Sequence, residues 1–217
     1  MGFYGDHVLP RLIDLLLRGK DTHELRARVA SNLTGEVLEI GFGSGLNVPF
    51  YPAGLTRVRA VDPASLGRKL AAGRVAASPV PIEYIGLDAQ RIPLPDNSVD
   101  SALTTWTLCS IPDAAGAVAE IRRVLRPGGT LHFAEHGRAP DSRVARAQDR
   151  LEPFQQRIFG GCRLTRSIDQ LISGSGLELT ALRTYYRPGP RPTSYTYEGQ
   201  ARNQSSAGTA SVDRNLR

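Results

Sequence analysis

The chain has 217 residues, 41% of them hydrophobic and 22% charged, which suits one globular domain with a sizeable core. No apolar run approaches the roughly 18 residues of a membrane span, and the N-terminus lacks the pattern of a signal peptide. Two cysteines without zinc-site spacing argue against a disulfide framework and predict no metal site. These features together predict a cytoplasmic protein.

The net charge of +6 comes mostly from arginine, since lysine occurs only at Lys20 and Lys69. A positive net charge favours binding to anionic partners in general. However, RNA-binding proteins typically carry a basic stripe interleaved with aromatic residues, and the sequence shows no such stripe. We therefore expect no nucleic-acid partner, and the oligomeric state stays open.

The chain divides into three parts. Apolar residues at helical spacing predict two helices over 8–33, so residues 1–34 form an N-terminal helical segment that we expect to cover the site. Residues 35–199 form the main domain. From about Gln200 the sequence offers little apolar surface to bury, which predicts a disordered tail over 200–217.

Strand and helix patterns alternate from residue 36 onward. The expected strands cover 36–40, 57–62, 82–86, 99–106 and 129–135, with later strands at 177–182 and 193–197. The expected helices cover 46–51, 64–77, 113–125 and 142–158. This alternation predicts an α/β fold in which parallel strands form one sheet with helices on both faces.

The helix expected at 142–158 has an apolar stripe and a second stripe of arginines. We expect the apolar stripe to pack on the sheet. Contact with a membrane surface is the alternative, because basic amphipathic helices can lie on anionic lipid.

A glycine-rich turn follows the first expected strand. Gly41, Gly43 and Gly45 occupy every second position after Val37–Ile40. Glycine allows a ligand to approach the backbone closely, and a helix beginning near Leu46 would direct free N–H groups at the same ligand. The pattern is typical of a nucleotide-type site in an α/β sheet.

Acidic residues follow the ends of neighbouring strands. Asp62 ends the second strand, where a carboxylate can accept both hydroxyls of a ribose. Asp88 follows the third strand and can accept the amine of an adenine, while the N–H of Ala89 faces a ring nitrogen. Glu39, just before the glycines, is expected to face a cationic part of the ligand.

As a set, these motifs resemble the class I S-adenosylmethionine-dependent methyltransferases. The matching residues are Glu39-x-Gly41-x-Gly43-x-Gly45, Asp62, Asp88-Ala89 with Leu94-Pro95-Asp96 and Asp100, and Leu125-Arg126-Pro127-Gly128-Gly129. The resemblance implies a Rossmann-like, seven-stranded, mostly parallel sheet with an antiparallel last strand, and S-adenosylmethionine as the cofactor. It also implies that Glu39 lies near the methionine amino group and that the backbone around Thr105-Trp106 supports the methionine.

Further motifs are similar to small methyltransferases related to the animal membrane-associated alkyl-thiol methyltransferases. They are Gly45-Leu46-Asn47 with Phe50-Tyr51-Pro52, Glu135-His136, and Gly161-Cys162-x-Leu164-Thr165-Arg166. This resemblance implies Asn47 as a cofactor-site residue and a thiol acceptor. Those relatives carry an N-terminal hydrophobic anchor, which this sequence does not show.

The acceptor is expected to be a small, apolar molecule, with a thiol favoured. A thiolate needs little help from a base, whereas an amine or hydroxyl must lose a proton. His136, just past the fifth strand, is the best candidate for that base. A quinone, a phenol and a phospholipid amine are the alternative acceptors.

Two other classes of protein share parts of this pattern. A dinucleotide-dependent oxidoreductase would use the same sheet and ribose contact. However, the sequence lacks the Gly-x-Gly-x-x-Gly spacing of those enzymes, because position 46 is Leu46, and it lacks a Tyr-x-x-x-Lys pair. A non-catalytic protein that keeps the cofactor fold is the second alternative. The intact acidic positions favour an enzyme.

Overall fold

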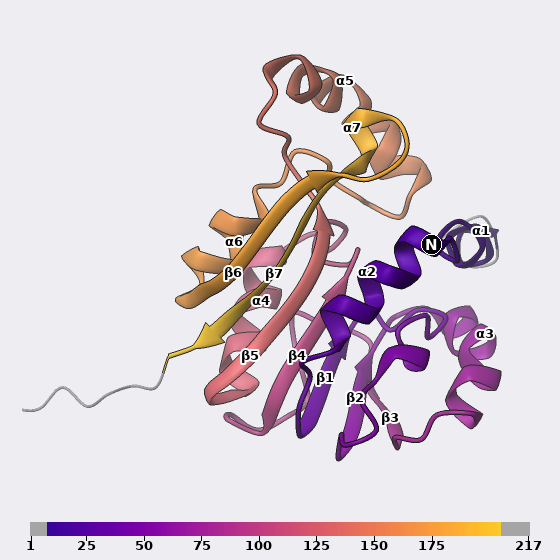
Figure 1. Cartoon of the computed structure of the whole chain (residues 1–217), viewed down its shortest axis with the longest axis vertical. Helices are drawn as coiled ribbons and strands as arrows, with labels where there is room; N and C mark the ends of the chain where they lie inside the picture. The colour runs from indigo at the N-terminus through magenta and orange to yellow at the C-terminus, as the bar shows by residue number, and fades with distance from the viewer. Residues whose placement is uncertain (1–7, 205–217) are drawn as a thin grey trace, which may run out of the picture.

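The computed structural model describes residues 8–204 and contains one seven-stranded sheet (Figure 1). The strand order is β3-β2-β1-β4-β5-β7-β6, in which β1 to β5 are parallel and β7 is antiparallel to both of its neighbours. The predicted α/β fold, including its antiparallel last strand, is confirmed.

The strands of the first half lie where the sequence predicts them. They are β1 (Glu36–Ile40), β2 (Arg57–Val61), β3 (Ile82–Gly86) and β4 (Val99–Thr105). Apolar β-branched runs form these strands, and β1 is buried from Val37 to Ile40 because helices cover both of its faces.

The second half of the sheet consists of β5 (Leu125–His136), β6 (Leu177–Tyr186) and β7 (Tyr195–Asn203). Strand β5 begins earlier than the expected 129–135. Residues 126–129 lie inside β5 as an irregularity, because Leu125 pairs with Val99 and the regular register resumes only at Thr130. Both late strands are longer than predicted, since each pairs along most of its length with the other.

Two apolar cores lie on the two faces of the sheet. Leu38 of β1 belongs to one core with α4 (Ala114–Val124) and α6 (Ile168–Gly174). Its neighbour Val37 belongs to the other core with α2 (Lys20–Ala30) and α3 (Ser65–Ala76). Alternate strand residues thus face opposite layers. The short helix α6 had no predicted counterpart.

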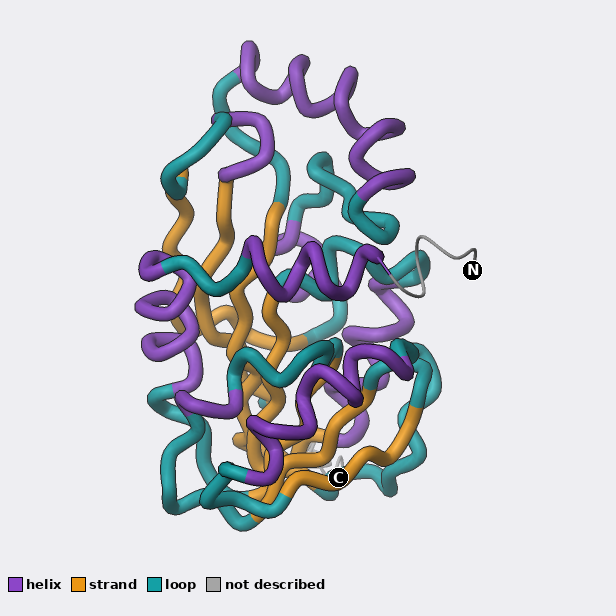
Figure 2. Tube along the Cα trace, turned by 90° about the vertical axis from the view of Figure 1, so that its right-hand side faces the viewer, coloured by secondary structure: helices purple, strands orange, loops and turns teal. Residues whose placement is uncertain are grey.

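The remaining helices lie near the ends of the strands. Helix α1 (Leu9–Leu16) lies against α3, and α5 (Ser142–Ile158) packs on the short α7 (Arg191–Ser194). Figure 2 shows α5 beyond the upper end of the sheet. No helix within residues 8–204 combines the length and apolar character that crossing a membrane requires.

The expectation that the apolar stripe of α5 packs on the sheet is wrong for its second half. Val144 is buried, whereas Leu151 is 40% exposed and Phe154 is 62% exposed. The helix is held instead through Gln148, whose side chain bonds the backbone of Gly137 and Ala139 beyond the end of β5.

The helix predicted over 46–51 is also wrong, because only the single 3-10 turn η2 (Val48–Phe50) forms there. Pro49 and Pro52 lack backbone N–H groups and interrupt the hydrogen-bond pattern of an α-helix. The expected helix N-terminus at the ligand site is therefore absent from this loop.

The boundary of the predicted disordered tail is wrong as well. Residues 200–203 belong to β7, where Ala201 is fully buried and Asn203 is 8% exposed. The side chain of Asn203 donates to the carbonyl of Leu125 at 2.7 Å, joining β7 to the start of β5. The rest of the predicted tail, from residue 205, lies outside the described residues.

We expect Asn203→Ala to lower the free energy of unfolding by about 1–3 kcal/mol, because the buried Leu125 carbonyl loses its donor. Urea unfolding measures the change. Arg202→Ala, at the exposed neighbouring position, is the matched control. If both variants are equally stable, the end of β7 does not contribute to the fold as described.

Candidate active site

The carboxyl ends of β1, β2, β4 and β5 carry most of the predicted site residues. This is the edge at which open α/β sheets bind ligands. The glycine turn follows β1, and all three of its predicted glycines adopt positive φ angles. At Gly41 a Cβ atom would lie 2.0 Å from Oγ1 of Thr107, so only glycine fits there.

Gly43 differs from Gly41 because the space beside it is open. A Cβ atom at Gly43 would meet only the carbonyl oxygen of Gly41, at 3.9 Å. The backbone N–H of Gly43 donates to Oδ2 of Asp62 at 2.7 Å. This tip of the turn is therefore held by Asp62 while one of its sides remains available to a ligand.

Asp62 lies just after β2 and is 6% exposed. Its second oxygen accepts the backbone N–H of Ala64 at 2.7 Å. Burial raises the pKa of Asp62, and the two backbone bonds oppose that shift. Because each carboxylate oxygen has two lone pairs, each can still accept a hydroxyl.

Glu39 is the centre of a buried polar network. Its Oε1 accepts Nδ2 of Asn47 at 2.9 Å, and its Oε2 accepts the hydroxyl of Tyr51. Asn47 Nδ2 also donates to Oγ1 of Thr105, at 3.0 Å. Glu39, Asn47 and Thr105 are thus brought together as predicted site residues, although the Glu39 carboxylate is 1% exposed and faces its own protein.

Arg26 completes this network and was not predicted. Its guanidinium donates to Oδ1 of Asn47 at 2.6 Å and to Oγ1 of Thr105 at 2.9 Å. Burial lowers the pKa of Arg26 to about 10, while the charge of Glu39 opposes the shift. The sequence offers one sign that Arg26 is buried. It lies beside Leu25 and three residues before Val29, so it falls on the apolar side of α2.

Both N-terminal helices therefore contact the site. Arg26 comes from α2, and Asp14 of α1 accepts the hydroxyl of Ser44 in the glycine turn at 2.7 Å. Arg74 of α3 donates to the backbone carbonyl of Ser44 at 2.7 Å. The turn is held from three helices.

Asp88 and Ala89 lie apart from this network. Asp88 is exposed in the loop after β3, and its Oδ1 accepts the backbone N–H of Gln90 at 2.8 Å. Ala89 is 9% exposed and belongs to the apolar core beneath the loop. Among the predicted cofactor residues, these two have no hydrogen bond in the structure with Glu39, Asn47 or Asp62.

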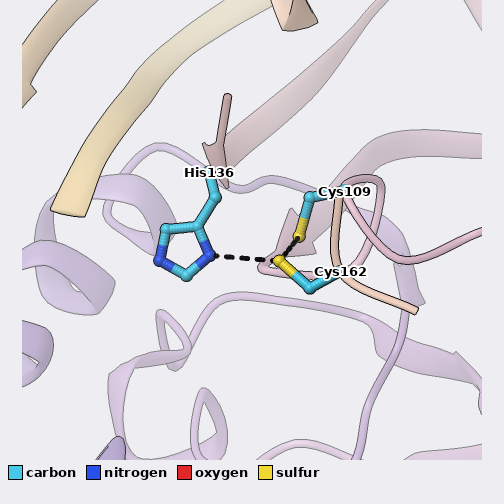
Figure 3. A group of neighbouring side chains, drawn as sticks. All are labelled: Cys109, His136 and Cys162. Carbon is cyan, nitrogen blue, oxygen red and sulfur yellow. Dashed lines mark hydrogen bonds between the residues drawn. The ribbon is translucent and has the colours of Figure 1, made fainter. Parts of the chain in front are cut away.

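His136 is the last residue of β5 and is half-buried beside two cysteines (Figure 3). Its Nδ1 lies 3.7 Å from Sγ of Cys162, which lies 3.6 Å from Sγ of Cys109. The hydrogen bond between the thiols lowers the pKa of Cys162 and, together with burial, raises the pKa of Cys109.

Glu135, next to His136, faces inward. Its two oxygens accept the backbone N–H groups of Thr107 at 3.1 Å and Cys109 at 3.2 Å. Burial raises the pKa of Glu135, and these backbone bonds oppose the shift. The carboxylate thus shapes the loop after β4 and is not available to an acceptor.

Trp106 connects the two groups of residues. Its ring centroid lies 4.8 Å from the guanidinium of Arg26 on one side of the site and 6.2 Å from the ring of His136 on the other. Its φ angle of 52° is unusual for a bulky residue. Strain of this kind concentrates at functional sites.

We expect the stability of the protein to depend on pH through Glu39. Burial raises its pKa from 4.5 to about 7, so the native state binds more protons than the unfolded chain between these values. The stability that Glu39 contributes is therefore present below pH 4.5 and is lost as the pH rises through about 7.

Urea unfolding of the wild type and Glu39→Gln across this range measures the effect. The stability of the wild type relative to the variant should fall as the pH rises. His132, whose burial lowers its pKa to about 4, contributes with the opposite sign but is common to both proteins. A difference that does not change with pH would contradict the prediction.

Comparison with known proteins identifies the domain. A family model described as a methyltransferase domain matches residues 38–133. The thiol S-methyltransferase TMT1B of Rattus norvegicus is 37% identical over 136 residues, which cover 60% of this chain and 54% of that protein. The phosphatidylethanolamine N-methyltransferase of Cereibacter sphaeroides is 25% identical over 178 residues, covering 79% of this chain and 85% of that protein.

The chain thus spans about half the length of the thiol methyltransferases it matches, 54% for the rat protein. Among solved structures, an S-adenosylmethionine-dependent methyltransferase from Thermotoga maritima, described as a possible histamine N-methyltransferase, has the same fold. Its TM-score is 0.64 at 20% identity, covering 91% of this chain and 99% of that one.

The matched domain decides against the oxidoreductase alternative, and S-adenosylmethionine is the cofactor that it indicates. The fold and the matched residues lead to the same family. The chain carries a methyltransferase domain of the class I S-adenosylmethionine-dependent methyltransferases.

Proposed function

We propose that this protein transfers a methyl group from S-adenosylmethionine to a small, apolar thiol. The single observation that carries the cofactor site is the contact between Gly43 and Asp62, at 2.7 Å, beside the open space at Gly43. A glycine with open space at its Cβ position and a carboxylate with free lone pairs fit the ribose side of a nucleoside.

The residues around this contact have distinct proposed roles. Asp62 accepts the ribose hydroxyls, and the glycine turn passes beneath the cofactor. Asp88 accepts the adenine amine, and the N–H of Ala89 faces the ring. These roles agree with the exposed position of Asp88 and with the apolar core beneath Ala89.

The methionine end of the cofactor would lie toward the buried network. The backbone around Thr105 supports the methionine, and Asn47 presents its amide group to the same region. Glu39 supplies the negative charge that balances the ammonium group, acting through its hydrogen bond to Asn47. Arg26, bonded to Asn47 and Thr105, supplies a positive charge for the carboxylate.

The chemistry places modest demands on the protein. S-adenosylmethionine, when bound, supplies an electrophilic methyl group, so the protein mainly aligns the acceptor and excludes water. A thiol suits a site in which Glu135 is occupied by backbone N–H groups, because thiols ionise near pH ~8.5 without a strong base. The relative TMT1B supports the same acceptor class.

A phospholipid amine is the second candidate. The phosphatidylethanolamine N-methyltransferase matches this chain over 85% of its own length, a larger share than the thiol methyltransferase does. An amine acceptor would have to lose a proton, and His136 is then the residue proposed to take it. We rank this candidate second because the phosphatidylethanolamine N-methyltransferase is 25% identical to this chain, whereas TMT1B is 37% identical.

We expect Asp62→Ala to weaken binding of S-adenosylhomocysteine by about 1.5–3 kcal/mol, because a charge-assisted pair of hydrogen bonds to the ribose is lost. Calorimetry measures the affinity, and circular dichroism checks that the variant is folded. Asp149→Ala, an exposed carboxylate on α5, is the control and should bind as the wild type does. Unchanged affinity in Asp62→Ala would assign Asp62 to the turn alone.

The acceptor is tested with labelled S-adenosylmethionine and matched alkyl thiols, amines and phenols, together with vesicles that contain phosphatidylethanolamine. We expect label to appear in the thiols, at a rate that rises with pH toward the pKa that the acceptor thiol has in the site. Asp62→Ala provides the blank. Methylation of amines or phenols alone would exclude the thiol acceptor, and labelled phosphatidylethanolamine would select the second candidate.

A further inference from the structure

Three side chains of metal-binding type meet beside the end of β5. Cys109 comes from the loop after β4, His136 ends β5, and Cys162 lies in the loop after α5 (Figure 3). Their ligand atoms all lie within 4.8 Å of one another. The segments that carry them are far apart in the sequence, so the fold alone assembles this group.

The distances match those that zinc requires. With Zn–S bonds of about 2.3 Å and a Zn–N bond of about 2.0–2.1 Å, tetrahedral geometry separates two sulfurs by about 3.8 Å and a sulfur from a nitrogen by about 3.6 Å. The observed separations are 3.6 Å between the sulfurs and 3.7 Å from Cys162 Sγ to His136 Nδ1. These two pairs already have the spacing of a tetrahedral site. The third pair, Cys109 and His136, has ligand atoms within 4.8 Å of each other and would have to close toward about 3.6 Å to admit the ion.

The backbone around the group is held in place. Glu135 accepts the N–H of Cys109, and the backbone N–H of Arg163 donates to the carbonyl of Cys109 at 2.8 Å. Arg166 donates to the carbonyl of Ile111 at 2.9 Å and also bonds the carbonyl of Leu108. Since these contacts tie the two cysteine loops together, the ligands are positioned before a metal arrives.

We propose that Cys109, His136 and Cys162 bind one zinc ion and leave its fourth coordination position for the acceptor. Two sulfurs and an imidazole are the donor set that zinc favours, and three protein ligands with an open position are typical of catalytic zinc. The two cysteines are 1% and 5% exposed, whereas His136 is half-buried and lies beside Trp106. The group is therefore more accessible at His136 than at the two cysteines.

The identity of the fourth ligand rests on the proposed function. A thiol that binds zinc loses its proton to solvent and becomes a thiolate. Its sulfur then forms a bond to the methyl carbon, while the bond from that carbon to the cofactor sulfonium breaks and leaves neutral S-adenosylhomocysteine. His136 acts here as a ligand, so no side chain has to take the proton.

Metal content tests the proposal directly. The full chain, prepared without a metal-binding tag, is analysed by plasma mass spectrometry, and we expect about one zinc per chain. The variants Cys109→Ala, Cys162→Ala and His136→Ala should each lose the ion. His23→Ala, an exposed histidine on α2, is the matched control and should retain it.

Cobalt provides a second measurement that does not depend on fragile variants. Wild-type protein stripped with a chelator is titrated with Co²⁺, and thiolate-to-metal absorption with tetrahedral bands is expected. Loss of a residue that only supports a metal ligand lowers metal affinity by roughly 10–100-fold. Removal of one of the three ligands should lower the affinity for Co²⁺ by more than this. Circular dichroism and a thermal shift with S-adenosylhomocysteine show whether each variant remains folded.

Three results would overturn the metal site. They are wild-type protein that binds neither zinc nor cobalt, a Cys162→Ala variant that retains the metal, and a Cys109–Cys162 disulfide in metal-free protein, which would assign the pair to redox chemistry. Thiol methylation by zinc-free protein would refute the acceptor's place on the ion and leave the proposed function standing. Bound zinc with methylation of amines alone would support the metal site and refute the thiol acceptor.

Discussion

The structure of the site depends on one buried carboxylate. Glu39 lies in a strand whose neighbours are apolar and fully enclosed, and a charge in such a place is costly unless it is paired. Its partners are Asn47 and Tyr51, from the segment after β1, and the charge of Arg26 from α2 acts on it as well. Compensating one charge thus holds the segment after the glycine turn, the end of β4 and an N-terminal helix in a single arrangement.

A second buried carboxylate organises the other half of the site in a similar way. Glu135 at the end of β5 takes its hydrogen bonds from the backbone of the loop after β4. That loop carries Cys109, so the position of the sulfur is a consequence of satisfying Glu135. Both carboxylates therefore act as supports for the segments that surround them.

Trp106 lies where the two halves meet. The guanidinium groups of Arg26 and Arg187 each lie 4.8 Å from its ring centroid, and the ring of His136 is its aromatic neighbour. Trp106 thus joins the residues around Glu39 to those around His136. The solved methyltransferase from Thermotoga maritima has the same fold at 20% identity, so very different sequences form this architecture.

The amino-acid sequence by itself determined the positions of the strands in the first half, the glycine turn and the acidic positions after the strands. These features are local, since alternation, glycine and strand-end carboxylates can be recognised within short windows. Even locally, Pro49 and Pro52 prevented the helix expected at 46–51, and pairing with β5 and β6 drew residues 200–203 into β7. Only the tertiary structure decided that Arg26 joins Asn47 and Thr105, and that two cysteines and a histidine meet, because those contacts join residues far apart in the chain.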